Sequence, residues 1–227
     1  YRKVLKEKCK IRTCLVDNMD LDSDRNYFTP VYRFDSYIFF RNIEQVKQLS
    51  REAGIAVTSF DDWLELAECM IERAISRDVV VFKSGLAYER PIYYEKVNYA
   101  QAEAAFNKIF NYFHLPNSAS RELNILNIGK EFQDYMMHFI LRIINKHGLT
   151  VQFHTGIQEG NGNMLGNSNP LQLNNLFLTY NNIKFDLFHI SYPYYREAIA
   201  LCKMFPNVYL DMCWAHIISP RSSMDFL

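Results

Sequence analysis

The stretch TVQFHTGIQEGNGN (150–163) begins like a buried strand and ends as a polar turn, with His154 at the boundary. A core strand favours apolar residues to its end, and a simple turn needs no imidazole at its start. The glycine, asparagine and glutamine residues that follow are typical of a loop. We therefore interpret His154 as a residue of a metal site at the mouth of a barrel of strands.

Other apolar segments resemble this strand, and segments with helical spacing separate them. Both faces of such strands must be covered, because their hydrophobicity is continuous rather than alternating; this is typical of a parallel sheet wrapped by helices. The predicted strands are 11–17, 31–40, 79–85, 150–156, 184–191 and 208–214. The predicted helices are 43–54, 59–78, 95–111, 120–147, 169–180 and 194–205.

Alternating strands and helices predict an α/β fold. A dinucleotide-binding unit is disfavoured because no GxGxxG motif follows the first strand. A (β/α)₈ TIM barrel has eight strands, and about six are recognisable here, so we expect about strands 2 to 7. The chain opens on YRKVLKEKCK and closes on ISPRSSMDFL, both of which read as helix. We therefore predict a single domain over 1–227 that is incomplete at both ends.

The composition excludes several function classes. The 25 basic and 25 acidic residues give a net charge of +0, which argues against nucleic acid and against anionic membranes as partners. Five scattered cysteines without a CxxC pair favour a reducing, cytoplasmic location. No apolar run is long enough to span a membrane. The expected partner is a small-molecule substrate, and the many tyrosines and phenylalanines would also suit a homo-oligomer contact.

Four predicted strands carry a polar residue at the carboxyl end: Lys83, His154, His189 and Asp211. In a (β/α)₈ barrel these positions converge on the catalytic face. Imidazole suits zinc, manganese or iron, so we expect a divalent metal, zinc first, with His154 and His189 as ligands. Each residue also has a structural interpretation: a hydrogen-bonded histidine, a lysine that reaches solvent, and an aspartate that caps the following loop.

Further polar residues near these strand ends are candidates for substrate binding. Tyr88 and Arg90 follow Lys83, and arginine could hold a carboxylate in a bidentate pair. The loop after His154 supplies amides that suit polyhydroxy or carboxylate ligands. The substrate-binding candidates are Tyr88, Arg90, Gln158, Asn161, Asn163 and His216. Their structural alternatives are a surface salt bridge, a packed ring and an ordinary flexible turn. His114, His138 and His147 are expected to be surface residues.

Three segments resemble the amidohydrolase-related branch of the amidohydrolase superfamily: HTGIQEGNGN, the run from Asn169 to Trp214, and the closing HIISP. The resemblance implies a metal-dependent TIM barrel and places uronate isomerase-like and decarboxylase proteins nearby. It implies that His154 and His189 are the histidines of strands five and six, and that Lys83 lies on strand four, where some members carry a carboxylated lysine. The family's His-x-His pair and metal-binding aspartate are expected outside this chain.

The leading hypothesis is a metal-dependent hydrolase of a small polar substrate that uses metal-activated water. His189, Lys83 and Asp211 are the predicted catalytic residues, and His154 and His189 the predicted metal ligands. Uronate isomerisation and decarboxylation of a carboxylate substrate are alternatives, because a fold does not determine its chemistry. A non-catalytic barrel that binds a ligand is the alternative from another class.

Overall fold

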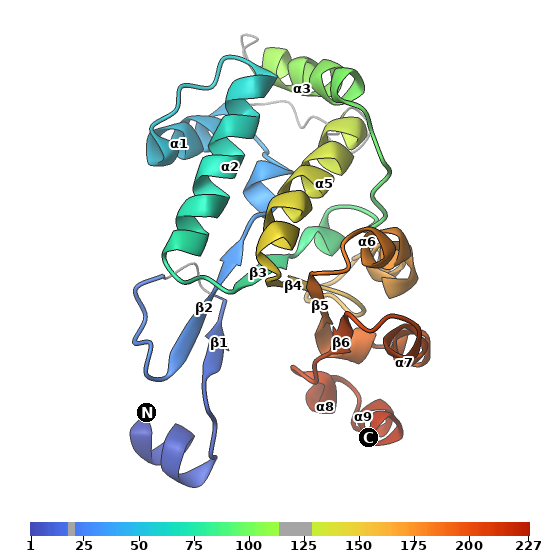
Figure 1. The fold of residues 1–227 in the computed structure, drawn as a ribbon. Helices are drawn as coiled ribbons and strands as arrows, with labels where there is room; N and C mark the ends of the chain where they lie inside the picture. Colours follow the sequence, from blue (N-terminus) through green and yellow to red (C-terminus); the bar gives the residue numbers. More distant parts are fainter. Residues whose placement is uncertain (18–20, 114–128) are drawn as a thin grey trace.

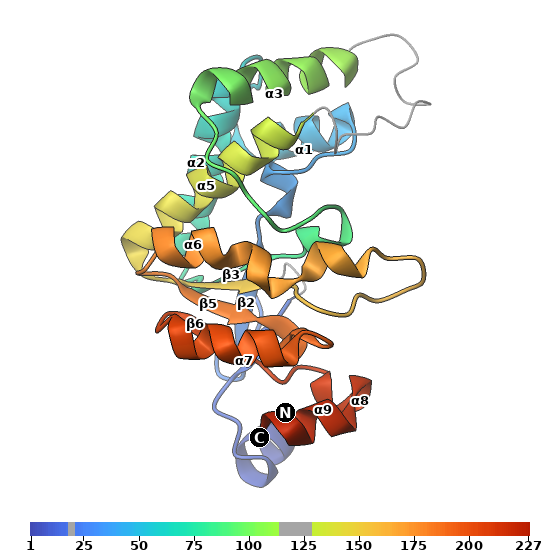
Figure 2. The ribbon, with the colours of Figure 1, turned by 90° about the vertical axis from the view of Figure 1, so that its right-hand side faces the viewer.

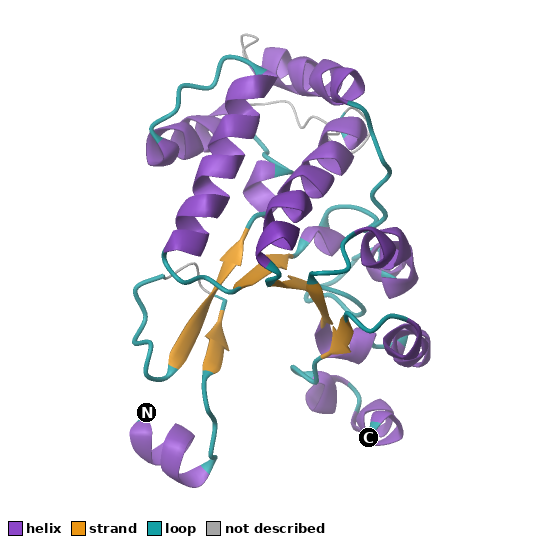
Figure 3. Cartoon of the chain, in the orientation of Figure 1, coloured by secondary structure: helices purple, strands orange, loops and turns teal. Residues whose placement is uncertain are grey.

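The computed structural model describes residues 1–17, 21–113 and 129–227. Six strands form one parallel sheet whose spatial order is their order along the chain. The sheet curls into part of a barrel (Figures 1 and 3). The strands are β1 Cys14–Val16, β2 Phe28–Arg33, β3 Val81–Ser84, β4 Thr150–Phe153, β5 Lys184–Leu187 and β6 Val208–Leu210. The predicted α/β fold and six-stranded part of a TIM barrel are confirmed.

The helices that connect these strands lie on the outer side of the curled sheet, and two short helices follow the last strand (Figures 1 and 2). The helices are α1 Ile43–Ala53, α2 Phe60–Ser76, α3 Tyr99–Phe113, α5 Lys130–His147, α6 Asn174–Thr179, α7 Tyr195–Met204, α8 Ala215–Ile218 and α9 Pro220–Phe226. A π-helical turn, η1 Lys3–Lys8, precedes β1. Among the described residues, none of the helices is long and apolar enough to cross a membrane.

An aromatic core joins α2, α3 and α5. Trp63, Phe106 and Phe132 are almost completely buried, and Phe40 packs against Trp63 with the ring centroids 5.0 Å apart. The indole of Trp63 donates a hydrogen bond of 3.0 Å to the carbonyl of Tyr37. Large aromatic side chains remove much apolar area from water, so this core holds the helices together and fixes them against the sheet.

The predicted helix ends are confirmed where the sequence carries capping residues. Ser59 and Asp62 form the capping box at the start of α2. Gly54 and Gly148 end α1 and α5 in the left-handed conformation, which glycine adopts without steric cost. The predicted segment 120–128 lies outside the described residues, and α5 is described from Lys130.

Each of the six predicted strands extends beyond the end of the observed strand, and two of them run into 3₁₀ turns. The segment predicted as strand 31–40 is strand only to Arg33, and a 3₁₀ turn, η2 Asp35–Tyr37, follows. The segment predicted as strand 184–191 is strand only to Leu187. After it the turn η7 Phe188–Ser191 has positive φ at His189, Ile190 and Ser191 (62°, 48° and 56°). Residues in the left-handed conformation cannot continue a strand, so the apolar pattern of 184–191 predicted a longer strand than the structure has.

The prediction that His138 lies on the surface is wrong. His138 is only 5 % exposed, and its Nδ1 lies 2.8 Å from the hydroxyl of Tyr180, while Nε2 is 3.2 Å from the carbonyl of Tyr94. His147 is exposed, as predicted, and His114 lies outside the described residues. His138 is therefore a buried histidine with hydrogen bonds to both ring nitrogens.

Candidate active site

A row of polar side chains crosses the inner face of the sheet. The strand register pairs Arg33 with Lys83, Lys83 with Gln152, and Gln152 with Asp186. Paired residues of neighbouring strands point to the same face, so these four side chains form one row, which we call the polar row. All four line the same cavity.

This cavity has a volume of about 1120 Å³ and opens at the carboxyl ends of the strands. Such a size suits a small organic ligand. The predicted residues Lys83, Tyr88, His154, Gln158, His189 and Asp211 all line it. The fold thus brings together residues that are separated by more than a hundred positions in the sequence.

His154 directly follows β4 and is fixed by contacts on two sides. Its Nε2 lies 3.0 Å from the carbonyl of Ile157, and the ring of Tyr88 packs on it with the centroids 4.6 Å apart. Because a carbonyl only accepts, Nε2 carries the proton and Nδ1 keeps its lone pair. Within the described residues Nδ1 has no hydrogen-bond partner. Burial lowers the pKa of His154 to about 4, so the imidazole is neutral at pH 7.

His189 lies in the left-handed turn after β5 and has the opposite tautomer. Its Nδ1 lies 2.5 Å from the carbonyl of Cys213, which leaves Nε2 with the lone pair. Burial also lowers the pKa of His189. A positive φ at three successive non-glycine residues is strained, and such strain concentrates at functional sites.

The turn that carries His189 packs against Gly156. A Cβ atom on Gly156 would lie 2.3 Å from the carbonyl oxygen of Tyr192 and 2.5 Å from the carbonyl carbon of Ser191. Thr155 also donates a 3.0 Å hydrogen bond to the carbonyl of Phe188. The loops after β4 and β5 therefore pack tightly against each other, next to the two histidines.

The two imidazoles meet with their ring centroids 5.0 Å apart. Both are neutral and each keeps one unprotonated nitrogen, which is the form that binds a divalent metal. A catalytic zinc site usually takes about three protein ligands. In the described parts of the chain, no group of three or more histidine, cysteine, aspartate or glutamate residues is arranged to hold a metal. The pair thus fits part of a metal site and is incomplete without further ligands.

Lys83 and Arg33 share one carboxylate. The Nζ atom of Lys83 lies 2.5 Å from Oδ2 of Asp17, and Nε and Nη2 of Arg33 donate to Oδ1 and Oδ2 at 2.6 and 2.7 Å. Burial opposes ionisation of Asp17, but the hydrogen bonds from Arg33 and Lys83 outweigh it and lower the pKa of the carboxyl. Lys83 also lies over the ring of Phe188, 3.8 Å from its centroid.

The opposite side of the cavity is acidic. Asp186 accepts a 2.9 Å hydrogen bond from Nε2 of Gln152, and burial, reinforced by Asp211, raises the pKa of Asp186 to about 6. Burial likewise raises the pKa of Asp211. Oδ1 of Asp211 accepts from the backbone N–H groups of His189 and Cys213, both at 3.0 Å. Asp211 therefore holds the His189 turn as well as lining the cavity.

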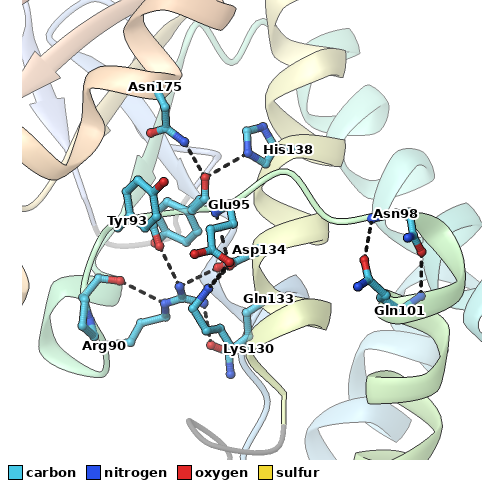
Figure 4. Close-up of polar contacts among 12 residues, drawn as sticks. Arg90, Tyr93, Glu95, Asn98, Gln101, Lys130, Gln133, Asp134, His138 and Asn175 are labelled. Carbon is cyan, nitrogen blue, oxygen red and sulfur yellow. Dashed lines mark hydrogen bonds and ion pairs between the residues drawn. The ribbon is translucent and has the colours of Figure 1, made fainter.

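Several predicted substrate-binding residues lie elsewhere. Arg90 is buried in the helical layer, where its guanidinium contacts Asp134, Gln133 and the carbonyl of Tyr93 (Figure 4). This placement corrects the predicted clamp, because Arg90 is not available to a ligand in the cavity. Asn161, Asn163 and His216 are exposed and do not line the cavity. Among the described loop amides, Gln158 is the one that lines it.

The cavity residues that sequence reasoning missed include Asp17, Arg33, Gln152 and Asp186. Asp17 is the last residue of the first predicted strand, and this strand-end position could have indicated that it lies at the site. Arg33, Gln152 and Asp186 each interrupt an apolar strand. Gln152 lies two residues before His154, so both share a face of the strand. A polar residue inside a run of apolar ones, two positions from a predicted ligand, was the signal that could have revealed the polar row.

Comparison with known proteins agrees with this fold. Residues 126–225 match the model of the family described as Amidohydrolase. Over 88 residues the chain is 38 % identical to Protein fluG of Emericella nidulans, a match that covers 37 % of this chain and 10 % of that protein. The chain thus spans a small part of the curated relative.

Solved structures extend the similarity to the whole fold. A candidate metal-dependent hydrolase from Lactobacillus casei has a TM-score of 0.75 at 22 % identity, covering 100 % of this chain and 58 % of its own. Uronate isomerase from Thermotoga maritima has a TM-score of 0.67 at 14 % identity, covering 91 % of this chain and 50 % of its own. Glucuronate isomerase from Caulobacter crescentus has a TM-score of 0.66 at 18 % identity, and the match covers 99 % of this chain and 51 % of that protein.

These identities show the fold, and the family match concerns the carboxy-terminal part of the chain. The resemblance read from the sequence is thus confirmed: the chain is similar to the amidohydrolase superfamily in the sequence of residues 126–225 and, in its fold, to a metal-dependent hydrolase candidate and to uronate isomerases.

Proposed function

We propose that this chain provides part of the active site of a metal-dependent hydrolase that acts on a small polar substrate. The observation that carries the proposal is the pair His154 and His189: two neutral imidazoles, 5.0 Å apart in one cavity, with complementary tautomers fixed by backbone carbonyls. His154 and His189 would hold a divalent metal, zinc first. The further ligands would come from outside the described residues.

The chain's own residues prepare the site for this chemistry. A divalent metal bound at the pair would supply an activated water for hydrolysis. The carbonyl of Ile157 and the ring of Tyr88 keep His154 in one orientation. Asp211 fixes the His189 turn through two backbone N–H groups. Asp186, which lines the cavity and is ionised above a pKa of about 6, would accept a proton from the substrate or from water.

Lys83 has a defined role in this proposal. Its ammonium lies between Asp17 and the ring of Phe188, in the middle of the polar row. At that position it would stabilise negative charge that develops on the substrate during hydrolysis. Carboxylation of Lys83 would require breaking its contact with Asp17, so the arrangement favours the uncarboxylated lysine.

Substitution of His154 in the full-length protein tests the proposal. We expect His154→Ala to lower metal content and to reduce turnover about 100-fold or more, because metal activation contributes several kcal/mol. His147→Ala is the matched control, since His147 is an exposed histidine at the end of α5. Far-UV circular dichroism verifies that both variants fold. Retention of full turnover by His154→Ala would end the assignment.

A substrate panel separates the alternatives that share this fold. Amides and lactones report hydrolysis, uronates report isomerisation, and aromatic acids report decarboxylation. The non-catalytic alternative draws on the incomplete ligand set of the described residues. It predicts that elemental analysis of the full-length protein finds no transition metal, whereas the hydrolase proposal predicts a bound metal that His154→Ala removes.

A further inference from the structure

The cavity contains an arginine with hydrogen-bonding capacity to spare. Arg33 ends β2, and its side chain is 45 % exposed to the cavity and solvent. Nε and Nη2 are held by Asp17, which fixes the plane of the guanidinium. Within the described part of the chain, Nη1 has no hydrogen-bond partner. It lies near Gly85, where a Cβ atom would be 3.9 Å away.

A tyrosine hydroxyl is available in the same cavity. Tyr88 lines this cavity together with Arg33. Its oxygen accepts a 3.0 Å hydrogen bond from the backbone N–H of Glu159. A hydroxyl that accepts in this way can still donate its own hydrogen. Arg33 and Tyr88 therefore present donors to the cavity without described acceptors for them.

The distribution of charge determines which ligand group fits this end. Asp17 pairs with both Arg33 and Lys83, and the carboxylate of Asp35 also interacts electrostatically with these two cations. The attraction at this end therefore comes from directed donors rather than from excess positive charge. On the other side, Asp186 and Asp211 would repel an anion. The edge of a guanidinium matches the two oxygens of a carboxylate, and a phenolic O–H adds a third donor.

We propose that Arg33 and Tyr88 bind a carboxylate group of the substrate at the β2–β3 end of the cavity. The proposal rests on the proposed function for the identity of the ligand as a substrate, and it assigns to Arg33 the role that the sequence suggested for Arg90. Asp17 acts as the positioning residue that holds Arg33 in the orientation for binding. The bound carboxylate would place the rest of the molecule toward the histidine pair.

Binding measured without turnover tests this assignment. Isothermal titration of the full-length protein would use three carboxylates, D-glucuronate, succinate and benzoate, each compared with its amide. We expect at least one carboxylate to bind more tightly than its amide. Arg33→Gln should weaken that carboxylate about 10- to 100-fold, because a charge-assisted hydrogen bond is lost, and should leave the amide nearly unchanged.

Further variants separate the role of Arg33 from a general loss of structure. Arg41→Gln is the matched control: Arg41 is also exposed and paired with a carboxylate, Glu89, but it lies outside the cavity. It should bind every probe as the wild type does. The affinity of Arg33→Lys for the carboxylate should lie between those of the wild type and Arg33→Gln, because a lysine keeps the positive charge but lacks the planar, two-donor edge of a guanidinium. Tyr88→Phe should weaken the carboxylate about three- to tenfold.

Each outcome decides the proposal. No preference for any carboxylate over its amide, or an unchanged affinity in Arg33→Gln, overturns it. A loss confined to Arg33 and Tyr88 variants supports it. If the carboxylate binds through Arg33 but the metal-loaded protein turns nothing over, the binding site stands and the hydrolase proposal fails. If turnover occurs and Arg33→Gln binds normally, the hydrolase proposal stands and the carboxylate site fails.

Discussion

Two arginines show how differently this molecule uses the same side chain. Arg90, in the helical layer, is 3 % exposed, and all three guanidinium nitrogens donate to protein oxygens. Arg33, in the polar row, hydrogen-bonds one carboxylate among the described residues, that of Asp17, and its side chain is 45 % exposed and lines the cavity. A charge whose donors are all matched by buried acceptors contributes to the fold. A guanidinium that is oriented by one carboxylate but keeps hydrogen-bond donors without protein acceptors at a cavity is available to a ligand.

The acceptors confirm that the Arg90 site is closed. Oδ1 of Asp134 accepts a hydrogen bond from Arg90. Oδ2 accepts one of 2.6 Å from Lys130 and one of 3.2 Å from the backbone N–H of Glu95. Tyr94 lies under the guanidinium, with its ring centroid 4.7 Å away. This network ties α5 to the segment that follows η3 (Leu86–Tyr88). It is a structural network that shares no residue with the cavity lining.

The largest expected effect is the difference in unfolding free energy that is lost when each of these two arginines is replaced. Arg90→Met should lower the free energy of unfolding by about 3–5 kcal/mol, because it leaves the carboxylate of Asp134 buried without its main partner. Arg33→Met should lower it by less than about 1 kcal/mol, since exposed pairs contribute little. Urea denaturation of both variants measures the difference. Equal losses would contradict the distinction between a closed and an open arginine site.

A second comparison concerns two glycines of the loop after β4. Gly156 and Gly162 both have positive φ, 73° and 80°, but only Gly156 has backbone atoms where a Cβ would lie. Gly162→Ala should cost about 1–2 kcal/mol from conformation alone. Gly156→Ala should cost about 2–4 kcal/mol, because the new methyl group also displaces the turn that carries His189.

The same glycine pair also tests how the histidines are positioned. Gly156→Ala should reduce metal retention by the full-length protein, whereas Gly162→Ala should leave it unchanged. Denaturation and elemental analysis of the two variants provide the measurements. Similar behaviour of both variants would show that the contact between Gly156 and the 191–192 backbone does not set the distance between His154 and His189.

The fold could be predicted from the sequence because its signals are local and repeated. Continuous apolar strands, the Ser59 capping box and the glycines that end helices each depend on a few neighbouring residues. The strand-end positions of Lys83, His154 and His189 followed from the same rule. The gathering of these residues in one cavity needed only the parallel order of the strands.

The remaining features depend on distant contacts that local patterns do not contain. Arg90 follows Lys83 by seven positions, yet the buried carboxylate of Asp134, from a helix 44 residues away, takes it out of the cavity. Arg33 reaches the site because the register of β2 and β3 pairs it with Lys83. The strand before His189 ends early, where three residues with positive φ form a turn whose following backbone packs against Gly156. None of these partners is near in sequence.

The smallest expected effect concerns the pH dependence of stability. The pKa of His154 falls from an unfolded value of about 6.5 to about 4 on folding. Between these values the unfolded chain binds more protons than the folded chain, so stability falls as pH decreases from about 6.5 to about 4. The raised pKa values of Asp35 and Asp186 act in the opposite direction, because protonation favours their folded state.

A difference measurement isolates His154 from these opposing groups. The free energy of unfolding of metal-free wild type and of His154→Gln would be measured by urea denaturation at several pH values from 7 to 4. Asp35, Asp186 and His189 titrate in both proteins and largely cancel in the difference. Relative to the variant, the wild type should lose about 1–3 kcal/mol over this range. Parallel curves would mean that His154 protonates freely in the fold, which contradicts a buried neutral imidazole fixed by Ile157 and Tyr88.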